Sequence, residues 1–370
     1  MVKQESPQKT LLNLILKSKK STIPSYNWPR IIEKAQREGL TALLFYSLKQ
    51  KGLTCILNTQ TRERLEELYF SQLGQNILLI EEAKKILRAF EEKNVEAILL
   101  KGIHMQSLYP QSGLRPMTDI DLFIKEEDFD KAVEVIKTLG FKGNYGYREE
   151  YFKEKLMVDL HTSFINANRI SARASIIDKA NEVFSKETID FKLEGQRVKI
   201  LNIYDEIIYL CAHLFFHHGL RRLIWFFDIK LLIEKSADFN WNRLFERALS
   251  FGLEKPLFMC LLLAKTELGL KIPDEFLEKQ KQIKINKIEK KIYDNLFSGE
   301  GESAFRYLFT FFILKGLRRR VIFLKELFLP SPQLLKLIYS QKKPRSLSAC
   351  YYEHIKNITQ LALRTLKTIL

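Results

Sequence analysis

Two aspartates, Asp119 and Asp121, alternate with apolar residues in the segment from Thr118 to Ile124 of this 370-residue chain. In a strand, residues two apart point to the same face, so both carboxylates would share one side while Ile120 and Leu122 pack on the other. Two carboxylates held that close repel each other, and a hard divalent cation relieves the repulsion. The spacing therefore predicts a site for Mg²⁺, with Mn²⁺ as the alternative. Taken alone, it fits equally well an edge strand with a polar outer face.

Groups that can bind phosphate stand just before these aspartates. The apolar run from Asn94 to Leu100 has the length of a strand, and Lys101 and Gly102 break it. A glycine turn after a strand offers backbone N–H groups to phosphate, and Lys101 and Arg115 add positive charge. Combined with the aspartate pair, these residues are what a nucleoside triphosphate with Mg²⁺ requires.

A third carboxylate follows about forty residues later. Polar and apolar residues alternate from Leu156 to His161, which predicts a strand with Asp159 and His161 on one face. Asp159 is thus a candidate third acidic residue of the site, the alternative being an exposed polar position. His161 could orient substrate or contact phosphate, although a hydrogen-bonded histidine without a direct role is the favoured interpretation.

The sequence around the aspartates resembles a known family. The blocks LKGIHMQSLYP and GLRPMTDIDLFI are similar to the core of the DNA polymerase beta-type nucleotidyltransferase superfamily, in its branch of uncharacterised bacterial nucleotidyltransferases. The resemblance extends from about Ala42 to about Ser340. It implies an α+β fold, in which a mixed sheet with flanking helices is followed by a helical C-terminal domain. It also implies transfer of a nucleoside monophosphate from a nucleoside triphosphate, ATP among the candidates.

The resemblance also implies roles for single residues. Asp119, Asp121 and Asp159 would be the catalytic residues and the metal ligands. The residues expected to contact the nucleotide are Lys101, Gly102, Arg115, Thr118, His161 and His217.

A second block of the family resemblance lies in DEIIYLCAHLFFHHGLRRLIWFFDIKLLIEK, where His213, His217, Trp225 and Asp228 stand at the family's positions. The two histidines are four residues apart and would share one helical face, a spacing that can bind metal. That interpretation is disfavoured because no glutamate lies between them. The preferred expectation is that they line the cleft opposite the carboxylates, together with Arg221 and Arg222.

Hydrophobic periodicity divides the chain into four regions. Residues 1–92 are expected to form helices that pack on the catalytic sheet, including one from Trp28 to Glu38 with Asn27 as its N-cap. Residues 93–202 are the expected catalytic core and end in a hairpin with its turn at Glu194-Gly195. Residues 203–340 are the expected helical domain, and 341–370 a linker with a terminal helix.

Composition limits the class of protein. The chain is 46% hydrophobic and 28% charged, which is typical of a globular protein, and no apolar run reaches the length of a membrane span. No secretory signal is evident at its start, so a cytoplasmic location is expected. The four cysteines are far apart in sequence, which argues against a disulfide framework and a thiolate zinc site.

The net charge of +16 is concentrated in residues 271–370, which contain 20 Lys and Arg against 9 Asp and Glu. Such asymmetry favours a polyanionic partner, and nucleic acid, an anionic membrane surface, a phosphorylated acceptor and a merely solvated basic face all remain open. The segment from Ala304 to Phe328 is apolar and basic enough for attachment to a membrane surface, but a packed pair of helices with an arginine-rich link is favoured.

Two functions compete. In the first, the chain is a Mg²⁺-dependent nucleotidyltransferase that releases pyrophosphate. Its acceptor is expected to be a small molecule or a protein rather than nucleic acid, because the aromatic residues of the basic region lie in apolar helical stripes. In the second, the chain is a catalytically degenerate protein of the same fold that binds a nucleotide or a partner. The three aspartates favour the first.

Overall fold

The computed structural model describes residues 6–17, 26–144, 147–164, 174–283, 285–291, 305–339 and 346–369. Within these ranges seven strands form one mixed sheet in the order β3-β4-β5-β2-β1-β7-β6. The strands are β1 (Ala97–Leu100), β2 (Ile120–Ile124), β3 (Lys142–Asn144), β4 (Tyr147–Lys153), β5 (Leu156–His161), β6 (Thr188–Leu193) and β7 (Gln196–Leu201). The pairs β2–β5 and β1–β7 are parallel, and the other four are antiparallel. The fold is therefore α+β, as predicted.

Helices precede, interrupt and follow the strands. Before the sheet lie α1 (Pro7–Leu16), α2 (Trp28–Glu38), α3 (Thr41–Gln50) and α4 (Thr59–Glu92), and between strands lie α5 (Gly102–Met105), α6 (Phe129–Thr138) and α7 (Ala174–Lys186). After the sheet follow α8 (Ile203–His213), α9 (Leu223–Glu234), α10 (Trp241–Phe251), α11 (Glu254–Leu268), α12 (Asp274–Glu278), α14 (Phe305–Ile313), α15 (Leu317–Phe328), α16 (Pro332–Ile338) and α17 (Leu347–Ile369). No helix among the described residues is long and apolar enough to cross a membrane.

Local sequence signals explain several boundaries. Asn27 caps α2 by accepting a hydrogen bond from the backbone N–H of Arg30, as the sequence predicts. Glu194 and Gly195 both adopt positive φ angles, 45° and 94°, and join β6 to β7. A two-residue turn of this kind matches the twist of the strands, so the predicted hairpin is confirmed.

The sheet separates two hydrophobic cores. Ile120, Leu122 and Ile124 of β2 face a core that α4 and α6 cover. Phe123 faces the other way, stacks on Phe164 at 4.2 Å between ring centroids, and belongs to the core formed with α8. This alternation places Asp121, which lies between Ile120 and Leu122, on the face toward α8.

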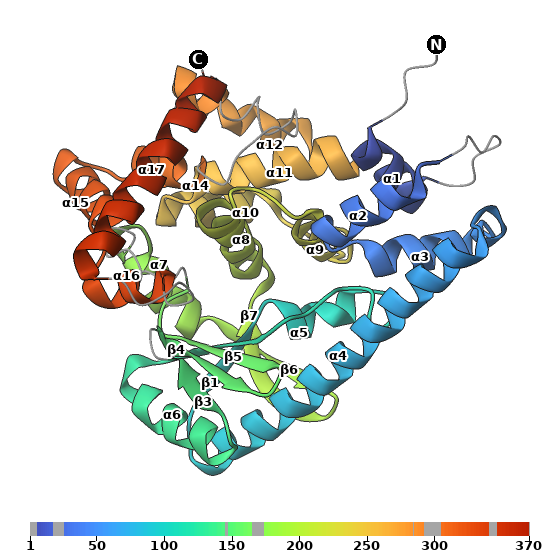
Figure 1. Ribbon diagram of the computed structural model, residues 1–370, viewed down its shortest axis with the longest axis horizontal. Helices are drawn as coiled ribbons and strands as arrows, with labels where there is room; N and C mark the ends of the chain where they lie inside the picture. Colours follow the sequence, from blue (N-terminus) through green and yellow to red (C-terminus); the bar gives the residue numbers. More distant parts are fainter. Residues whose placement is uncertain are drawn as a thin grey trace.

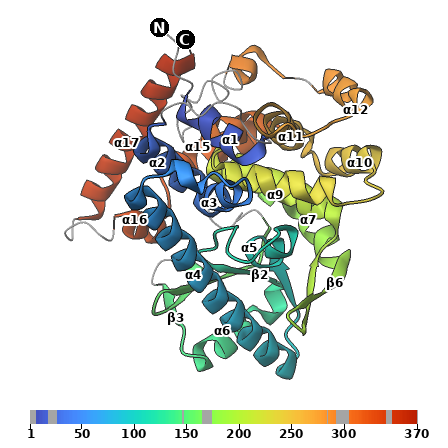
Figure 2. The same ribbon diagram turned by 90° about the vertical axis from the view of Figure 1, so that its right-hand side faces the viewer.

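The N-terminal helices are distributed differently from the prediction. Helix α4 runs along the sheet (Figure 1), but α1 to α3 share the hydrophobic core of α8 to α11, and α1 contacts α11. Figure 2 shows the same grouping from the side. The reason is that α1 buries Leu11, Leu12 and Leu14 on one face, which packs mainly against α2 and α3 and also contacts α11. Residues 1–92 therefore do not form one layer on the sheet.

The C-terminal region keeps most of its predicted elements. The segment from Ala304 to Phe328 forms two helices, α14 and α15, which confirms the helix pair and leaves no single long apolar helix. The sequence also predicts a helix from Ile285 to Phe297, of which residues 287–291 are helical and residues 292–297 lie outside the described residues. Most of the predicted linker from Gln341 to Ser348 lies outside them too. Helix α3 and strand β4 were not predicted.

Candidate active site

Neighbouring strands bring two carboxylates and an imidazole together. In the parallel pair β2–β5, Asp121 lies opposite Asp159, and His161 follows two residues later on the same face. The His161 Nε2 atom is 2.8 Å from Asp121 Oδ1 and 3.4 Å from Asp159 Oδ2. One ligand atom from each of the three residues lies within 4.8 Å of the others, and all three residues are buried.

Asp119 does not complete this cluster, although the sequence predicted it as half of the metal pair. Strand β2 begins at Ile120, so Asp119 lies in the preceding loop, where it is half-buried and accepts a hydrogen bond from the Thr118 hydroxyl at 3.1 Å. Burial and the negative charge of Asp121 raise the pKa of Asp119 to about 6. The third member of the cluster is His161, where the sequence predicted Asp119.

Lys101 supplies a cation to the cluster from within the chain. Its ammonium donates a hydrogen bond to Asp121 Oδ1 at 2.7 Å, and both side chains are buried. Burial alone would lower the pKa of Lys101, but the charge of Asp121 overrides it and raises that pKa. Burial alone would likewise raise the pKa of Asp121, but Lys101 and His161 hold it well below its usual range. Asp121 is therefore ionised and already paired.

The backbone at Lys101 is strained. Its φ of 51° and ψ of −124° belong to a region that residues with a side chain rarely adopt. Gly102 follows and begins α5. A Cβ atom at Gly102 would lie 3.0 Å from Nη1 of Arg115, so the turn is packed directly against that guanidinium. Glycine at this position thus makes room for Arg115.

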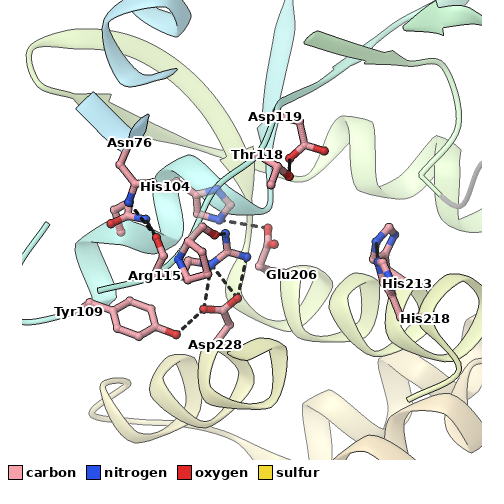
Figure 3. A network of polar contacts seen from close by, with 12 residues as sticks. Asn76, His104, Tyr109, Arg115, Thr118, Asp119, Glu206, His213, His218 and Asp228 are labelled. Carbon is pink, nitrogen blue, oxygen red and sulfur yellow. Dashed lines mark hydrogen bonds and ion pairs between the residues drawn. The ribbon is translucent and has the colours of Figure 1, made fainter. Parts of the chain in front are cut away.

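Arg115 forms its polar contacts with other residues of the protein. The sequence predicted a phosphate contact, but the structure places the buried guanidinium in an ion pair with Asp228 of α9 (Figure 3). Arg115 Nε and Nη2 each lie 2.9 Å from Asp228 Oδ2, and the Tyr109 hydroxyl donates to Oδ1 at 2.7 Å. Asn76 and Gln106 donate to the Arg115 carbonyl oxygen. This network ties the loop before β2 to two helices, so Arg115 acts as a positioning residue.

One face of α8 contributes polar groups, of which the sequence predicted His213 but not Glu206 and Tyr209. Glu206, Tyr209 and His213 occur at positions i, i+3 and i+7 of a mostly apolar helix, and that spacing is the signal that could have revealed the first two. Glu206 is 2% exposed, forms an ion pair with His104 at 3.4 Å, and neither of its carboxylate oxygens has a hydrogen-bond partner among the described residues. Burial raises the pKa of Tyr209, whose hydroxyl lies beside the charges of Lys101 and Asp121.

The histidines of the second block form a stack. His213 packs on both His217 and Trp225 with ring centroids 4.9 Å apart, and its Nε2 lies 3.0 Å from Nε2 of His218. Burial and the nearby charge of Lys101 hold the pKa of His213 well below its usual range. The chain forms a short π-helix here, from Leu214 to His218, a deviation that often occurs at functional sites. His213 is thus close enough to Lys101 and His161 to interact with their charges, and His217 stacks on it.

Arg221 and Arg222 lie elsewhere. They border a cavity of about 410 Å³ with Lys34 and Arg37 of α2, and none of the three aspartates lines it. The prediction that these arginines face the carboxylates is wrong, because the π-helix ends at Gly219 with a φ of 57° and directs the following loop toward α2.

The cluster fits a divalent cation. Its donor set is two carboxylates and one imidazole, and carboxylate oxygens suit Mg²⁺ and Mn²⁺, whereas an imidazole nitrogen suits Mn²⁺ better than Mg²⁺. Because His161 already donates to Asp121, the carboxylates are the ligands that both ions share. Asp121 and Asp159 are therefore the residues that would hold such a cation.

Comparison with known proteins assigns the chain to a family. Residues 24–269 match the family described as uncharacterised nucleotidyltransferase, and this match covers more than half of the chain. The chain therefore belongs to that family. Among solved structures it is similar to an antigenic nucleotidyltransferase-like protein from Paracoccidioides brasiliensis, with 14% identity over 52% of this chain and 93% of that chain and a TM-score of 0.33. No curated protein matches the chain.

Proposed function

We propose that this chain transfers a nucleoside monophosphate from a nucleoside triphosphate to an acceptor and releases pyrophosphate, with Mg²⁺ as the metal. The observation that carries the proposal is the register of β2 and β5, which sets Asp121 beside Asp159 in a member of a nucleotidyltransferase family. Paired carboxylates on neighbouring strands are the arrangement that a metal-bound triphosphate needs.

Each residue of the site has a proposed task. Asp121 and Asp159 hold the cation, and Asp119 in the adjacent loop can join them when a nucleotide enters. When bound, the metal would stabilise negative charge on the attacking and leaving oxygens. Lys101 and the backbone N–H of Gly102 bind phosphate oxygens. Of the other predicted nucleotide contacts, Thr118 is exposed beside Asp119, His161 orients Asp121, and His217 supports His213.

The transfer step needs a nucleophile and a proton acceptor. The acceptor oxygen attacks the α-phosphorus, the bond from that phosphorus to the pyrophosphate oxygen breaks, and the acceptor proton passes to the Asp159 carboxylate. Pyrophosphate leaves with the bonding electron pair. We propose a small molecule or a protein as acceptor, and ATP as the first triphosphate to test.

A labelling experiment tests this function. The protein would be incubated with each α-³²P-labelled triphosphate, Mg²⁺ and a cell extract, and label on an acceptor would be measured. We expect Asp121→Asn and Asp159→Asn to lower the rate at least about a hundredfold, because each removes a charged ligand. Asp190→Asn is the matched control, since Asp190 of β6 is an exposed carboxylate that pairs with Lys199 of β7. Equal label transfer by all four proteins would refute the assignment.

A second function has its own supporting observation. Lys101 already neutralises Asp121 within a buried cluster. A protein that binds nucleotide without transferring it could keep this ion pair for stability alone. The two functions differ in outcome, because a binding protein would retain the labelled triphosphate in equilibrium dialysis yet leave no label on any acceptor.

A further inference from the structure

The ammonium of Lys101 stands where a cation would be expected. Asp121 Oδ1 accepts hydrogen bonds from both Lys101, at 2.7 Å, and His161, at 2.8 Å. The same carboxylate belongs to the group whose ligand atoms meet within 4.8 Å. Because Lys101 raises the positive charge on this side of the cluster, it competes directly with any metal for Asp121.

The backbone fixes the starting point of this side chain. Lys101 directly follows β1 and has a glycine-like φ of 51°, and the next residue, Gly102, packs against Arg115. Strain of this kind persists where the surroundings over-determine it, and it is common at functional sites. The four-carbon stem of lysine is flexible, however, so the ammonium can move while its Cα stays in place.

We propose that Lys101 is a displaceable internal cation that makes metal binding conditional on nucleotide. Without nucleotide, the ammonium pairs with Asp121 and weakens metal binding. When a triphosphate enters, its phosphates provide a new negative partner, the ammonium moves to them, and Asp121 becomes available to the metal. This inference rests on the proposed function and adds that metal and triphosphate bind cooperatively at this site.

Mn²⁺ binding, followed by electron paramagnetic resonance and by calorimetry, tests the proposal without measuring activity. For the unmodified protein we expect Mn²⁺ to bind at least about tenfold more tightly in the presence of a non-hydrolysable triphosphate analogue. Lys101→Gly removes the cation and suits the backbone angle, so it should bind Mn²⁺ alone at least about tenfold more tightly than the unmodified protein. Lys101→Arg keeps the charge and should resemble the unmodified protein.

The outcomes separate this inference from the proposed function. Equal Mn²⁺ affinity of the unmodified protein and Lys101→Gly, each without nucleotide, would overturn the role of Lys101 as a displaceable cation. It would not bear on the proposed nucleotidyl transfer. Absence of Mn²⁺ binding by every variant, with or without the analogue, would overturn both. Circular dichroism of each variant excludes loss of fold as the cause of either result.

A different part of the molecule carries a second inference. A groove of about 300 Å³ between α14, α15 and α17 has an almost entirely apolar lining that includes Phe311, Leu324 and Leu361. Beside it, Leu317, Val321 and Leu324 follow at i, i+4 and i+7 on α15 with exposures of 78%, 55% and 39%. Leucine and valine side chains exposed in one row on a helix form an apolar surface that a membrane or another protein can cover.

The charges of α15 indicate which phase that is. Residues 315–328 contain five cations, Lys315, Arg318, Arg319, Arg320 and Lys325, against one carboxylate, Glu326. An apolar row flanked by lysine and arginine is the pattern of a helix that lies in the interface of an anionic bilayer. We propose that α15 and the adjoining groove dock on an anionic membrane surface, with Leu317 and Val321 entering the acyl boundary.

Vesicle co-sedimentation tests the docking surface. We expect binding to vesicles of equimolar phosphatidylglycerol and phosphatidylcholine, and at least about tenfold weaker binding to pure phosphatidylcholine. The double variant Leu317→Ser/Val321→Ser and the double variant Arg318→Gln/Arg319→Gln should each weaken it. Leu249→Ser, at an exposed leucine of α10, is the control.

Other occupants of this surface would give other results. Equal sedimentation of the unmodified protein and both double variants would overturn the proposal. Salt-sensitive binding to single-stranded RNA without vesicle binding would overturn it in favour of nucleic acid. Concentration-dependent self-association that Leu317→Ser/Val321→Ser abolishes, again without vesicle binding, would show that a second copy covers the surface instead.

Discussion

Two buried pairs of a cation and a carboxylate lie at the candidate site, and they are built differently. Arg115 and Asp228 form several hydrogen bonds, and Tyr109 adds another to the same carboxylate. Lys101 meets Asp121 through one hydrogen bond, from a strained backbone, and His161 shares the same oxygen. The partners of Asp228 are thus arranged around both of its oxygens, while one oxygen of Asp121 accepts from two donors, Lys101 and His161.

This difference separates a structural pair from an exchangeable one. An arginine fork matches a carboxylate in a fixed geometry and loses it only when the surroundings rearrange. A lysine ammonium is a point charge on a flexible stem, and it can exchange one anion for another. Lys101 directly precedes Gly102, and Arg115 packs against Gly102. The rigid Arg115–Asp228 pair therefore positions the turn from which the Lys101 side chain extends.

Breaking the rigid pair should have the largest effect. We expect Asp228→Ala to lower the free energy of unfolding by about 3 to 5 kcal/mol, because it leaves the Arg115 charge buried without its partner. Urea denaturation measures the change. Asp190→Ala serves as the control, since Asp190 makes an exposed pair. A loss no larger than that of the control would show that the Arg115 network does not support the fold.

Asp119 sharpens the comparison because it is an acid of the same site outside both pairs. Its pKa is about 6 in the folded protein against an ordinary 3.8, so the folded state binds more protons between these values and stability falls as pH rises through this window. The cost is complete above pH 6. Asp119→Asn should therefore stabilise the metal-free protein by about 1 to 2 kcal/mol at pH 7, and by almost nothing below the ordinary pKa.

Unfolding at several pH values in the presence of EDTA checks this expectation. The control is the same series for Thr118→Val, which removes the hydroxyl that donates to Asp119 and should raise the Asp119 pKa further. A stability difference between Asp119→Asn and the unmodified protein that does not change with pH would contradict the raised pKa.

The smallest expected effect concerns the strain at Lys101. Lys101→Ala and Lys101→Gly both remove the ammonium, but only alanine keeps a Cβ at a φ of 51°. We expect the glycine variant to be more stable than the alanine variant by about 1 kcal/mol. Chemical denaturation of the two variants in parallel gives this difference directly. A more stable alanine variant would show that the turn relaxes in solution to a conformation that any residue adopts.

The sequence identified the parts of the site more reliably than their partners. Alternation placed Asp121 and Asp159 on strand faces correctly, because period-two burial is a local property. That the two strands are parallel neighbours, with these aspartates in register, depends on pairing between distant segments. The start of β2 after Asp119 is likewise set by that pairing, which is why the structure groups Asp121 with Asp159 and His161 rather than with Asp119.

Long-range partners explain the remaining differences. Arg115 was predicted to bind phosphate because of its charge. Its partner Asp228 lies 113 positions away, so no pattern in the sequence near Arg115 indicates the ion pair. The direction of the Lys101 side chain follows from a φ angle that only the packed turn determines. Glu206 and Tyr209 were detectable in principle, since polar groups on one face of an apolar helix are a periodic signal.

The shared core of α1 to α3 with α11 has a consequence for biosynthesis. Helix α1 ends at Leu16, whereas α11 begins only at Glu254. At ordinary translation speeds of about 5 to 20 residues per second, roughly 10 to 50 s separate the emergence of the two from the ribosome. During that interval α2 and α3 can pack against α1, but the apolar surface that α1 to α3 share with α11 lacks that partner. The nascent chain therefore presents an apolar N-terminal surface to chaperones for most of its synthesis, and the core closes late.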